Sequence, residues 1–277
     1  METAQVQNPQ LSGQVMFYRQ PELLSKELHG KLGVNTAPTR FGYAVNTHVA
    51  PLTVQEFAQA STSFPIIFVG QDYNPVAVLG LHEGQNLFAT AEKGFDADSY
   101  VPAFIRRYPF VLAQADAGVP QAEGERMLVA IDRGYEYIAE NAEFPFFDAK
   151  GEPTAYTQNC MQFCNDFESQ VRTTRQFVDM LKQLDLFHQR NTTYTPQNVD
   201  GSPAGETQLI AEYFGVNEEK LKALPQKKAA ELVANGALQQ IYAHLNSLHC
   251  WDRLMTRHFV RFAAQEAEAA AKGAANT

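Results

Sequence analysis

The sequence contains few cysteines, and it has no long apolar run. Three cysteines in 277 residues cannot form a disulfide framework, and the odd count leaves one thiol free. The first ten residues, METAQVQNPQ, lack the basic start and apolar core of a secretory signal. We therefore expect a reducing, cytoplasmic location. Export by a signal that is not visible at the N-terminus stays open as an alternative. No run approaches the ~20 apolar residues that span a bilayer, so we predict no membrane span.

Positive charge is also scarce. The chain has 22 Lys and Arg residues against 31 Asp and Glu residues, which gives a net charge of -9. Because basic side chains supply most of the affinity for phosphate backbones, we expect no nucleic-acid partner. Hydrophobic residues make up 45% and charged residues 19% of the chain, which is typical of a globular protein with a sizeable core.

Catalytic and cofactor motifs are missing as well. The sequence has no G-x-S-x-G, Walker A, dinucleotide-binding G-x-G-x-x-G or H-E-x-x-H motif, so we predict no cofactor. Cys160 and Cys164 could place two thiolates on one metal ion, but structural zinc prefers tighter knuckles. We predict buried, inert thiols and no stoichiometric metal. For His244, His249 and His258, which share one predicted helix, we expect packing or surface roles.

The stretch from Phe64 to Ala113 has the clearest local pattern. Three short apolar runs, Pro65–Val69, Val76–Leu81 and Asn86–Thr90, are separated by turn residues. Runs of this length and spacing predict strands joined as antiparallel hairpins. We expect a helix to follow, capped by Asp96 or Asp98, and to end at Arg106–Arg107 before Pro109. The run Phe110–Ala113 then predicts another strand, as does Arg126–Asp132.

Helical signals flank this stretch and dominate the second half. Thr53 and Glu56 are spaced as a capping box, which predicts a helix to about Ser61. Apolar residues recur at helical spacing over Asn159–Phe187 and again over Ala237–Phe262, so both segments predict long helices. Shorter helices are expected at Glu218–Leu224 and Gln226–Ala234. The polar segment 189–207 is typical of a linker or long loop.

These elements predict an α+β fold: a mostly antiparallel sheet from the N-terminal half packed against helices, with a helical C-terminal half. Hairpin spacing disfavours a doubly wound parallel sheet, whose neighbouring strands need a helical crossover. We expect a β-rich region at 14–150 and a helical region at 151–265 in one integrated domain. The segments 1–13 and 266–277 are expected to be loose termini.

Several short sequence segments resemble those of a known protein family. Segments in both halves of the chain resemble the SapC family of bacterial proteins. In the first half they are FPIIF, GLHEGQNLF and YVPAFIRRYPF, and in the second half the segment runs from GVNEEKLKAL to IYAHLNSL. The similarity runs from about Tyr43 to about Met255. The resemblance implies a link to surface layers, from which the family takes its name, and it supplies no catalytic mechanism.

The candidate ligand-binding residues are Arg106, Arg107, Tyr108 and Asp252. The arginines either complement the negative end of their helix or clamp a carboxylate. Because Tyr108 precedes a proline, the chain turns at this corner, and we expect one arginine on the surface and the other directed inward. The inward arginine should meet a carboxylate, with Asp252 as the first candidate and Asp132 as the alternative.

Asp252 is a candidate because it lies in line between Leu248 and Met255, within an apolar stripe. A carboxylate buried there needs a partner, either in a structural ion pair, which we favour, or at a site that faces a cleft. For Asp132, which is followed by Arg133 and Gly134, we favour an ordinary turn.

Two functions remain in competition. The first is a non-catalytic binding or accessory protein that recognises a peptide, a protein or a surface-layer component, supported by the 11% aromatic content and the absence of catalytic motifs. The alternative is an enzyme, or an enzyme partner, acting on a peptide or amino-acid substrate with an arginine carboxylate clamp. A deep pocket lined by an arginine and an acidic group would favour the enzyme, and a shallow aromatic groove would favour binding. A homodimer through the helix Ala237–Phe262 is a third possibility.

Overall fold

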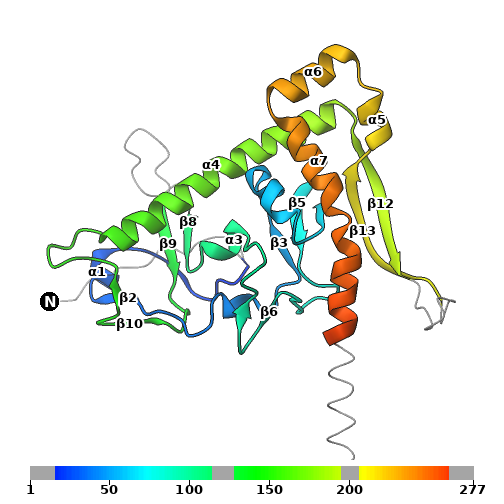
Figure 1. The fold of residues 1–277 in the computed structure, drawn as a ribbon. Coiled ribbons are helices and arrows are strands. Elements are labelled where there is room, and N and C mark those ends of the chain that lie inside the picture. Colours follow the sequence, from blue (N-terminus) through cyan, green and yellow to red (C-terminus); the bar gives the residue numbers. More distant parts are fainter. Residues whose placement is uncertain (1–15, 114–127, 195–205, 262–277) are drawn as a thin grey trace, which may run out of the picture.

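A computed structural model describes residues 16–113, 128–194 and 206–261, and it shows the α+β fold that the sequence predicts. The long helix α4 (Ala155–Gln183) crosses the molecule over two groups of strands (Figure 1). Within the described ranges, no helix combines the length and apolar character needed to cross a bilayer.

The central sheet has five antiparallel strands in the order β12-β13-β4-β5-β3. Two of the predicted strands are present as the hairpin β4–β5, and β3 pairs with the outer edge of β5. The bounds are β3 (Val49–Pro51), β4 (Ile66–Val69), β5 (Asn74–Val78), β12 (Phe187–Tyr194) and β13 (Gln208–Val216).

Strand β12 overturns our prediction of a polar linker or long loop over the first part of the segment 189–207, at residues 189–194. Side chains of β12 alternate between more and less exposed positions, with Gln189, Asn191 and Thr193 on the more exposed face of the strand. Strand β13 pairs with β4 through Phe214 and Phe68, which joins the second half of the chain to the sheet of the first half. The segment 195–205 between the two strands lies outside the described residues.

Two smaller sheets lie under the other half of α4, with the orders β1-β9-β8 and β10-β2-β11. Strands β6 and β7 form a separate pair, whose Ala89 and Phe95 pack in the main core. The predicted strands at Phe110–Ala113 and up to Asp132 are confirmed as β8 and β9, whereas only Ala89–Thr90 of the third apolar run is a strand. The bounds are β1 (Pro21–Leu23), β2 (Leu32–Val34), β6 (Ala89–Thr90), β7 (Gly94–Phe95), β8 (Phe110–Ala113), β9 (Leu128–Asp132), β10 (Ile138–Glu140) and β11 (Phe144–Pro145).

Helix α4 confirms the first predicted long helix, four residues earlier than the apolar stripe suggested. The Thr154 hydroxyl caps it by accepting from the Thr157 amide. The helix ends at Gln183, and Asp185 has a φ of 52°, a left-handed conformation that stops a helix. Phe187, which we placed in the helix, therefore begins β12.

The second predicted long helix is interrupted. Helix α7 (Ala237–Ser247) is followed by a turn, and helical backbone resumes over 250–261. The Ser247 hydroxyl donates to the His244 carbonyl oxygen at 2.6 Å, and the next amides bond three residues back instead of four. Such side-chain bonding within the helix competes with the regular ladder and bends it. Phe262 lies outside the described residues.

The shorter helices follow the sequence closely. The Thr53–Glu56 capping box is present at the start of η2, and the two helices predicted after 217 are confirmed as α5 and α6. The helix before Arg107 is confirmed as α3, but its N-cap is Pro102 and not an aspartate. The bounds are α1 (Lys26–His29), η1 (Gly42–Ala44), η2 (Val54–Glu56), α2 (Phe57–Ala60), α3 (Ala103–Arg106), α5 (Glu218–Lys222) and α6 (Gln226–Ala234).

The main core lies between the central sheet, α2, α7 and the later turns of α4, whereas the first turns of α4 pack on the smaller sheets. A buried polar pair fixes α7 to the central sheet. His244 bonds the Ile66 carbonyl oxygen through Nδ1 at 2.9 Å and accepts from the Val216 amide through Nε2 at 3.1 Å. Ser247 accepts from the Ile66 amide at 2.9 Å. His244 therefore has the packing role that we expected.

Candidate functional site

The corner after α3 separates its two arginines as predicted. Arg106, the last residue of α3, is exposed, whereas Arg107 is buried with 8% of its surface accessible. Consecutive helical residues point about 100° apart, so the two side chains leave the corner in different directions. The prediction of one outward and one inward arginine is confirmed.

Arg107 has different partners from those we expected. Its guanidinium lies between two aromatic rings, 4.5 Å from the centroid of Phe104 and 4.7 Å from that of Phe167. The nearest carboxylate is Glu168 of α4, at 3.7 Å from Nη1, which is too long for a hydrogen bond. Its Nε is buried and has no acceptor among the described residues. Aromatic faces therefore stabilise this cation.

Arg106 lies on the outside of the same corner. It donates from Nε to the Val101 carbonyl oxygen at 3.0 Å and from Nη2 to the Tyr100 hydroxyl at 3.1 Å. Its guanidinium also lies 5.3 Å from the ring centroid of Phe163 on α4. Tyr100 in turn donates to the buried carboxylate of Glu56 at 2.9 Å. These contacts orient Arg106, and no described carboxylate pairs with it.

Tyr108 and Asp132 form a structural contact. The Tyr108 hydroxyl donates to the Asp132 carboxylate at 2.8 Å, and burial together with this hydrogen bond raises the pKa of Tyr108. Asp132 is fully buried and also accepts from the backbone amides of Arg19, Gln20 and Gly134. The predicted turn at Asp132 is confirmed, and its role as the partner of Arg107 is wrong because these four donors already occupy the carboxylate.

Asp252 does not join the site. We expected a buried carboxylate in line with Leu248 and Met255, but the side chain is exposed. The tighter turn after Ser247 changes the phase of the helix, so Trp251 and Leu254 are the buried residues of this segment. Asp252 therefore needs no buried partner, and the structure does not place it with Arg106 or Arg107.

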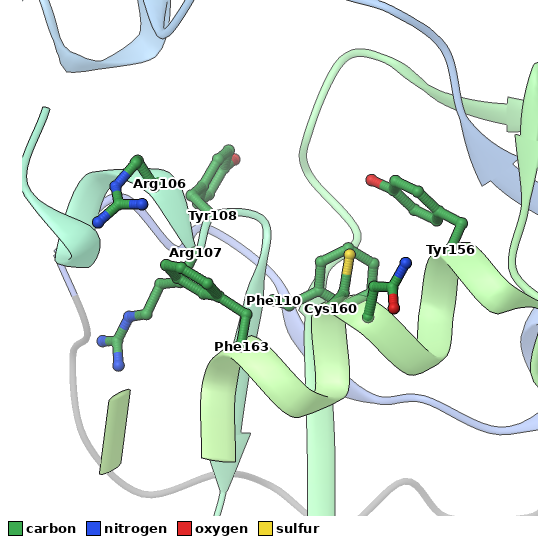
Figure 2. Close-up of a pocket in the computed structure, with 8 residues that line it drawn as sticks. Arg106, Arg107, Tyr108, Phe110, Tyr156, Cys160 and Phe163 are labelled. Atoms are coloured by element: carbon green, nitrogen blue, oxygen red, sulfur yellow. The ribbon is translucent and has the colours of Figure 1, made fainter. Parts of the chain in front are cut away.

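A cleft of about 220 Å³ opens beside the two arginines. Figure 2 shows Arg106 and Tyr108 on one side, with Tyr156, Cys160 and Phe163 of α4 on the other. No Asp or Glu is among the residues that line it. We call it the arginine cleft, and it is lined by Arg106, Arg107, Tyr108, Phe110, Tyr156, Asn159, Cys160 and Phe163.

The two cysteines on α4 are poor nucleophiles. Cys164 is buried, and Cys160, which lines the cleft, is half-buried, so the prediction of two buried thiols is correct for one and partly correct for the other. Burial raises the pKa of Cys164 to about 12 and raises that of Cys160. Both thiols are therefore protonated at neutral pH. In the described part of the chain, no three His, Cys, Asp or Glu side chains gather where they could hold a metal ion.

The comparison with protein families agrees with the resemblance carried by the sequence segments around this corner. The model of the SapC family matches residues 24–254, which include every residue of the arginine cleft. The chain belongs to the SapC family. A search of curated proteins and a search of solved structures gave no match.

Two residues of the cleft wall on α4, Tyr156 and Phe163, were missed from the sequence of this SapC protein, whereas Cys160 belonged to the predicted apolar stripe. Tyr156, Cys160 and Phe163 are spaced by four and three residues, which places them on one side of a helix. This spacing was available, but it could not show that the face lies opposite Arg106, since the two segments are about fifty residues apart. The stripe that we did predict packs on Phe104 and the smaller sheets through Cys164 and Phe167, and on the main core through Val178 and Leu181.

Proposed function

We propose that this SapC-family chain is a non-catalytic binding or accessory protein that holds a carboxylate-bearing peptide segment in the arginine cleft. The observation that carries the proposal is the pair Arg106 and Arg107, which both line the cleft: Arg106 pairs with no carboxylate of the described chain, and Arg107 approaches Glu168 only at 3.7 Å. Guanidinium groups bind carboxylates through paired, charge-assisted hydrogen bonds.

The shape and lining of the cleft support binding over catalysis. Its volume of about 220 Å³ is below the usual range for enclosed small-molecule pockets, and its walls include four aromatic rings. An enzyme would need an acid, a base or a nucleophile at the cleft, and no carboxylate lines it. The thiol of Cys160 and the hydroxyl of Tyr156 have raised pKa values because of burial, so neither is ionised at neutral pH.

The aromatic rings favour a peptide over a small acid. Tyr108 and Phe110 on one side, with Tyr156 and Phe163 on the other, offer apolar surface next to the charged groups. Tyrosine, phenylalanine and arginine are enriched in protein interfaces. Aromatic groups supply contact area there, and arginine supplies directional hydrogen bonds. A segment with a carboxylate beside an apolar side chain would match both parts. A surface-layer component is one such partner.

The test is fluorescence anisotropy with labelled peptides that end in Phe, Tyr or Leu next to a free carboxylate, and with the same peptides as C-terminal amides. The parent should bind the acids, and binding should weaken as salt increases because the contact is ionic. Arg106→Ala should weaken binding about 10- to 100-fold, since it removes charge-assisted hydrogen bonds. Arg172→Ala, an exposed arginine of α4 outside the cleft, is the matched control. Equal binding of acids and amides would refute the proposal.

A further inference from the structure

Strand β12 is a long free edge of the central sheet. Among the described residues β13 is the only strand that pairs with it, and Figure 1 shows β12 on the outside of the sheet. Its eight residues make it the longest edge strand of the described sheets, whereas β3 at the opposite edge has three residues and ends at Pro51. Proteins usually protect such edges by short strands, proline or lysine, because unpaired backbone groups attract another strand. Strand β12 is long and contains neither proline nor lysine.

The register of the hairpin shows which backbone groups of β12 are free. The Asn217 amide donates to the carbonyl oxygen of Leu186, the residue directly opposite it in the ladder of β12 and β13, at 2.7 Å. Opposite residues in an antiparallel ladder alternate between hydrogen-bonded and non-hydrogen-bonded pairs. Every second residue of β12 therefore bonds β13, and the residues between them direct N–H and C=O outward. The outward residues are Phe187, Gln189 and Asn191.

These three residues are complementary to themselves. Two antiparallel copies of β12 can meet at a two-fold axis through Gln189, which places Phe187 opposite Asn191 of the second copy and Gln189 opposite its own counterpart. Each outward N–H then has a C=O partner. The regular edge begins after the left-handed Asp185 and is followed by a shift of register after Thr192. The pairing thus uses the outward groups of the regular stretch.

Charge favours a second copy in this register. The net charge of -9 opposes self-association in general, but β12 contains one arginine and no acidic residue. An axis at Gln189 places Arg190 opposite His188 of the second copy. Burial lowers the pKa of His188 from 6.5, so this ring is neutral at pH 7. An axis one residue later would place Arg190 directly opposite Arg190 of the second copy, which is unfavourable.

From the free edge and its self-complementary register, we infer that the chain forms a homodimer in which the β12 strands of two copies pair antiparallel about Gln189. The pairing joins the two central sheets into one continuous sheet. The inference is independent of the arginine cleft, because no residue of β12 lines that cleft.

The first test is sedimentation of the full chain at pH 7 over a range of micromolar concentrations. The parent should reach twice the mass of one chain. Gln189→Lys places two like charges opposite each other at the axis and should weaken dimerisation about fivefold. Gln189→Pro removes an N–H that β13 does not use and blocks the edge, so it should stay monomeric. Gln176→Lys, the same change at an exposed position of α4, is the control and should dimerise like the parent.

The second test is oxidative cross-linking, which reports the register. Opposite residues of a hydrogen-bonded antiparallel pair have Cα atoms about 5.5 Å apart, within the range of a disulfide. Gln189→Cys should therefore give a covalent dimer. Asn191→Cys should give much less, because its counterpart lies four residues further along the second strand. The parent, with its native cysteines in place, is the control for other cross-links.

Three outcomes would overturn the inference. The first is a parent that stays monomeric at every concentration, whether or not it captures an extended peptide. The second is a dimer that persists in a folded Gln189→Pro variant, which would place the interface on another face such as the helix Ala237–Phe262. The third is cross-linking through Asn191→Cys as efficient as through Gln189→Cys. Circular dichroism checks the fold of Gln189→Pro, and if that variant unfolds, equal dimerisation of Gln189→Lys and Gln176→Lys overturns the inference in its place.

Discussion

The hydroxyl of Tyr108 lies 2.8 Å from the carboxylate of Asp132, and this contact fixes the chain at the corner that carries Arg106 and Arg107. Removing Asp132 would leave three backbone amides without their acceptor. We expect Asp132→Ala to lower the free energy of unfolding by about 3 kcal/mol, and Tyr108→Phe by about 1 kcal/mol. Denaturant unfolding at pH 7 measures both.

Asp252→Ala is the matched control for this prediction. Its carboxylate is exposed, so the free energy of unfolding should change by less than about 0.5 kcal/mol. A loss as large as that of Asp132→Ala would contradict the exposed position of Asp252 and restore the buried carboxylate that the apolar stripe suggested.

His244 makes stability depend on pH. Burial lowers the pKa of His244 from 6.5 to about 4, with a smaller contribution from the charge of Arg190. The folded protein keeps the ring neutral, while the unfolded chain protonates it below about 6.5. Stability from this residue is therefore complete above pH 6.5 and falls as the pH drops toward 4, by about 3 kcal/mol in total.

The measurement is the free energy of unfolding at several pH values between 7 and 4.5 for the parent, His244→Gln and His249→Gln. The first variant should be less stable at pH 7 and should lose less stability on acidification. His249, which is exposed in the turn after α7, is the control and should follow the parent. Parallel pH profiles for all three proteins would show that His244 does not titrate as described.

Thiol labelling measures whether an acidic peptide occupies the arginine cleft. Cys160 lines the arginine cleft, whereas Cys250 bonds the Ser61 carbonyl oxygen elsewhere on the molecule. Burial raises the pKa of both thiols, so an impermeant reagent should label them slowly at pH 7 and faster at pH 9. At pH 9, a saturating acidic peptide should slow labelling of Cys160 several-fold and leave Cys250 unchanged. Equal protection at both thiols would indicate a global effect and not occupancy of the cleft.

Local signals in the sequence were reliable where the contacts are local. The capping box of Thr53 and Glu56 depends on residues three apart, and the structure contains it. The long apolar stripe correctly predicted α4, and the proline after Tyr108 correctly predicted the corner that separates Arg106 from Arg107. In each case the physical cause lies within a few residues of its effect.

Contacts between distant segments were not predictable in the same way. Glu168 and Phe167 contact Arg107 from about sixty residues away, and the sequence contains no local sign of this pairing. Asp252 was misplaced because one bend after Ser247 changed the phase of a stripe that we treated as continuous. The strand β12 was missed since its composition is polar and its alternation is weak.

The most direct test of the carboxylate site is two-dimensional NMR of the arginine Nε–Hε signals, assigned with Arg106→Lys, Arg107→Lys and Arg172→Lys. The account predicts that an acidic peptide with a free carboxylate shifts the signals of Arg106 and Arg107, whose guanidinium groups have no hydrogen-bonded carboxylate in the described chain, and leaves that of Arg172 in place. The same peptide as an amide should shift none of them. Binding of the acid that leaves both cleft arginines unmoved would contradict the account.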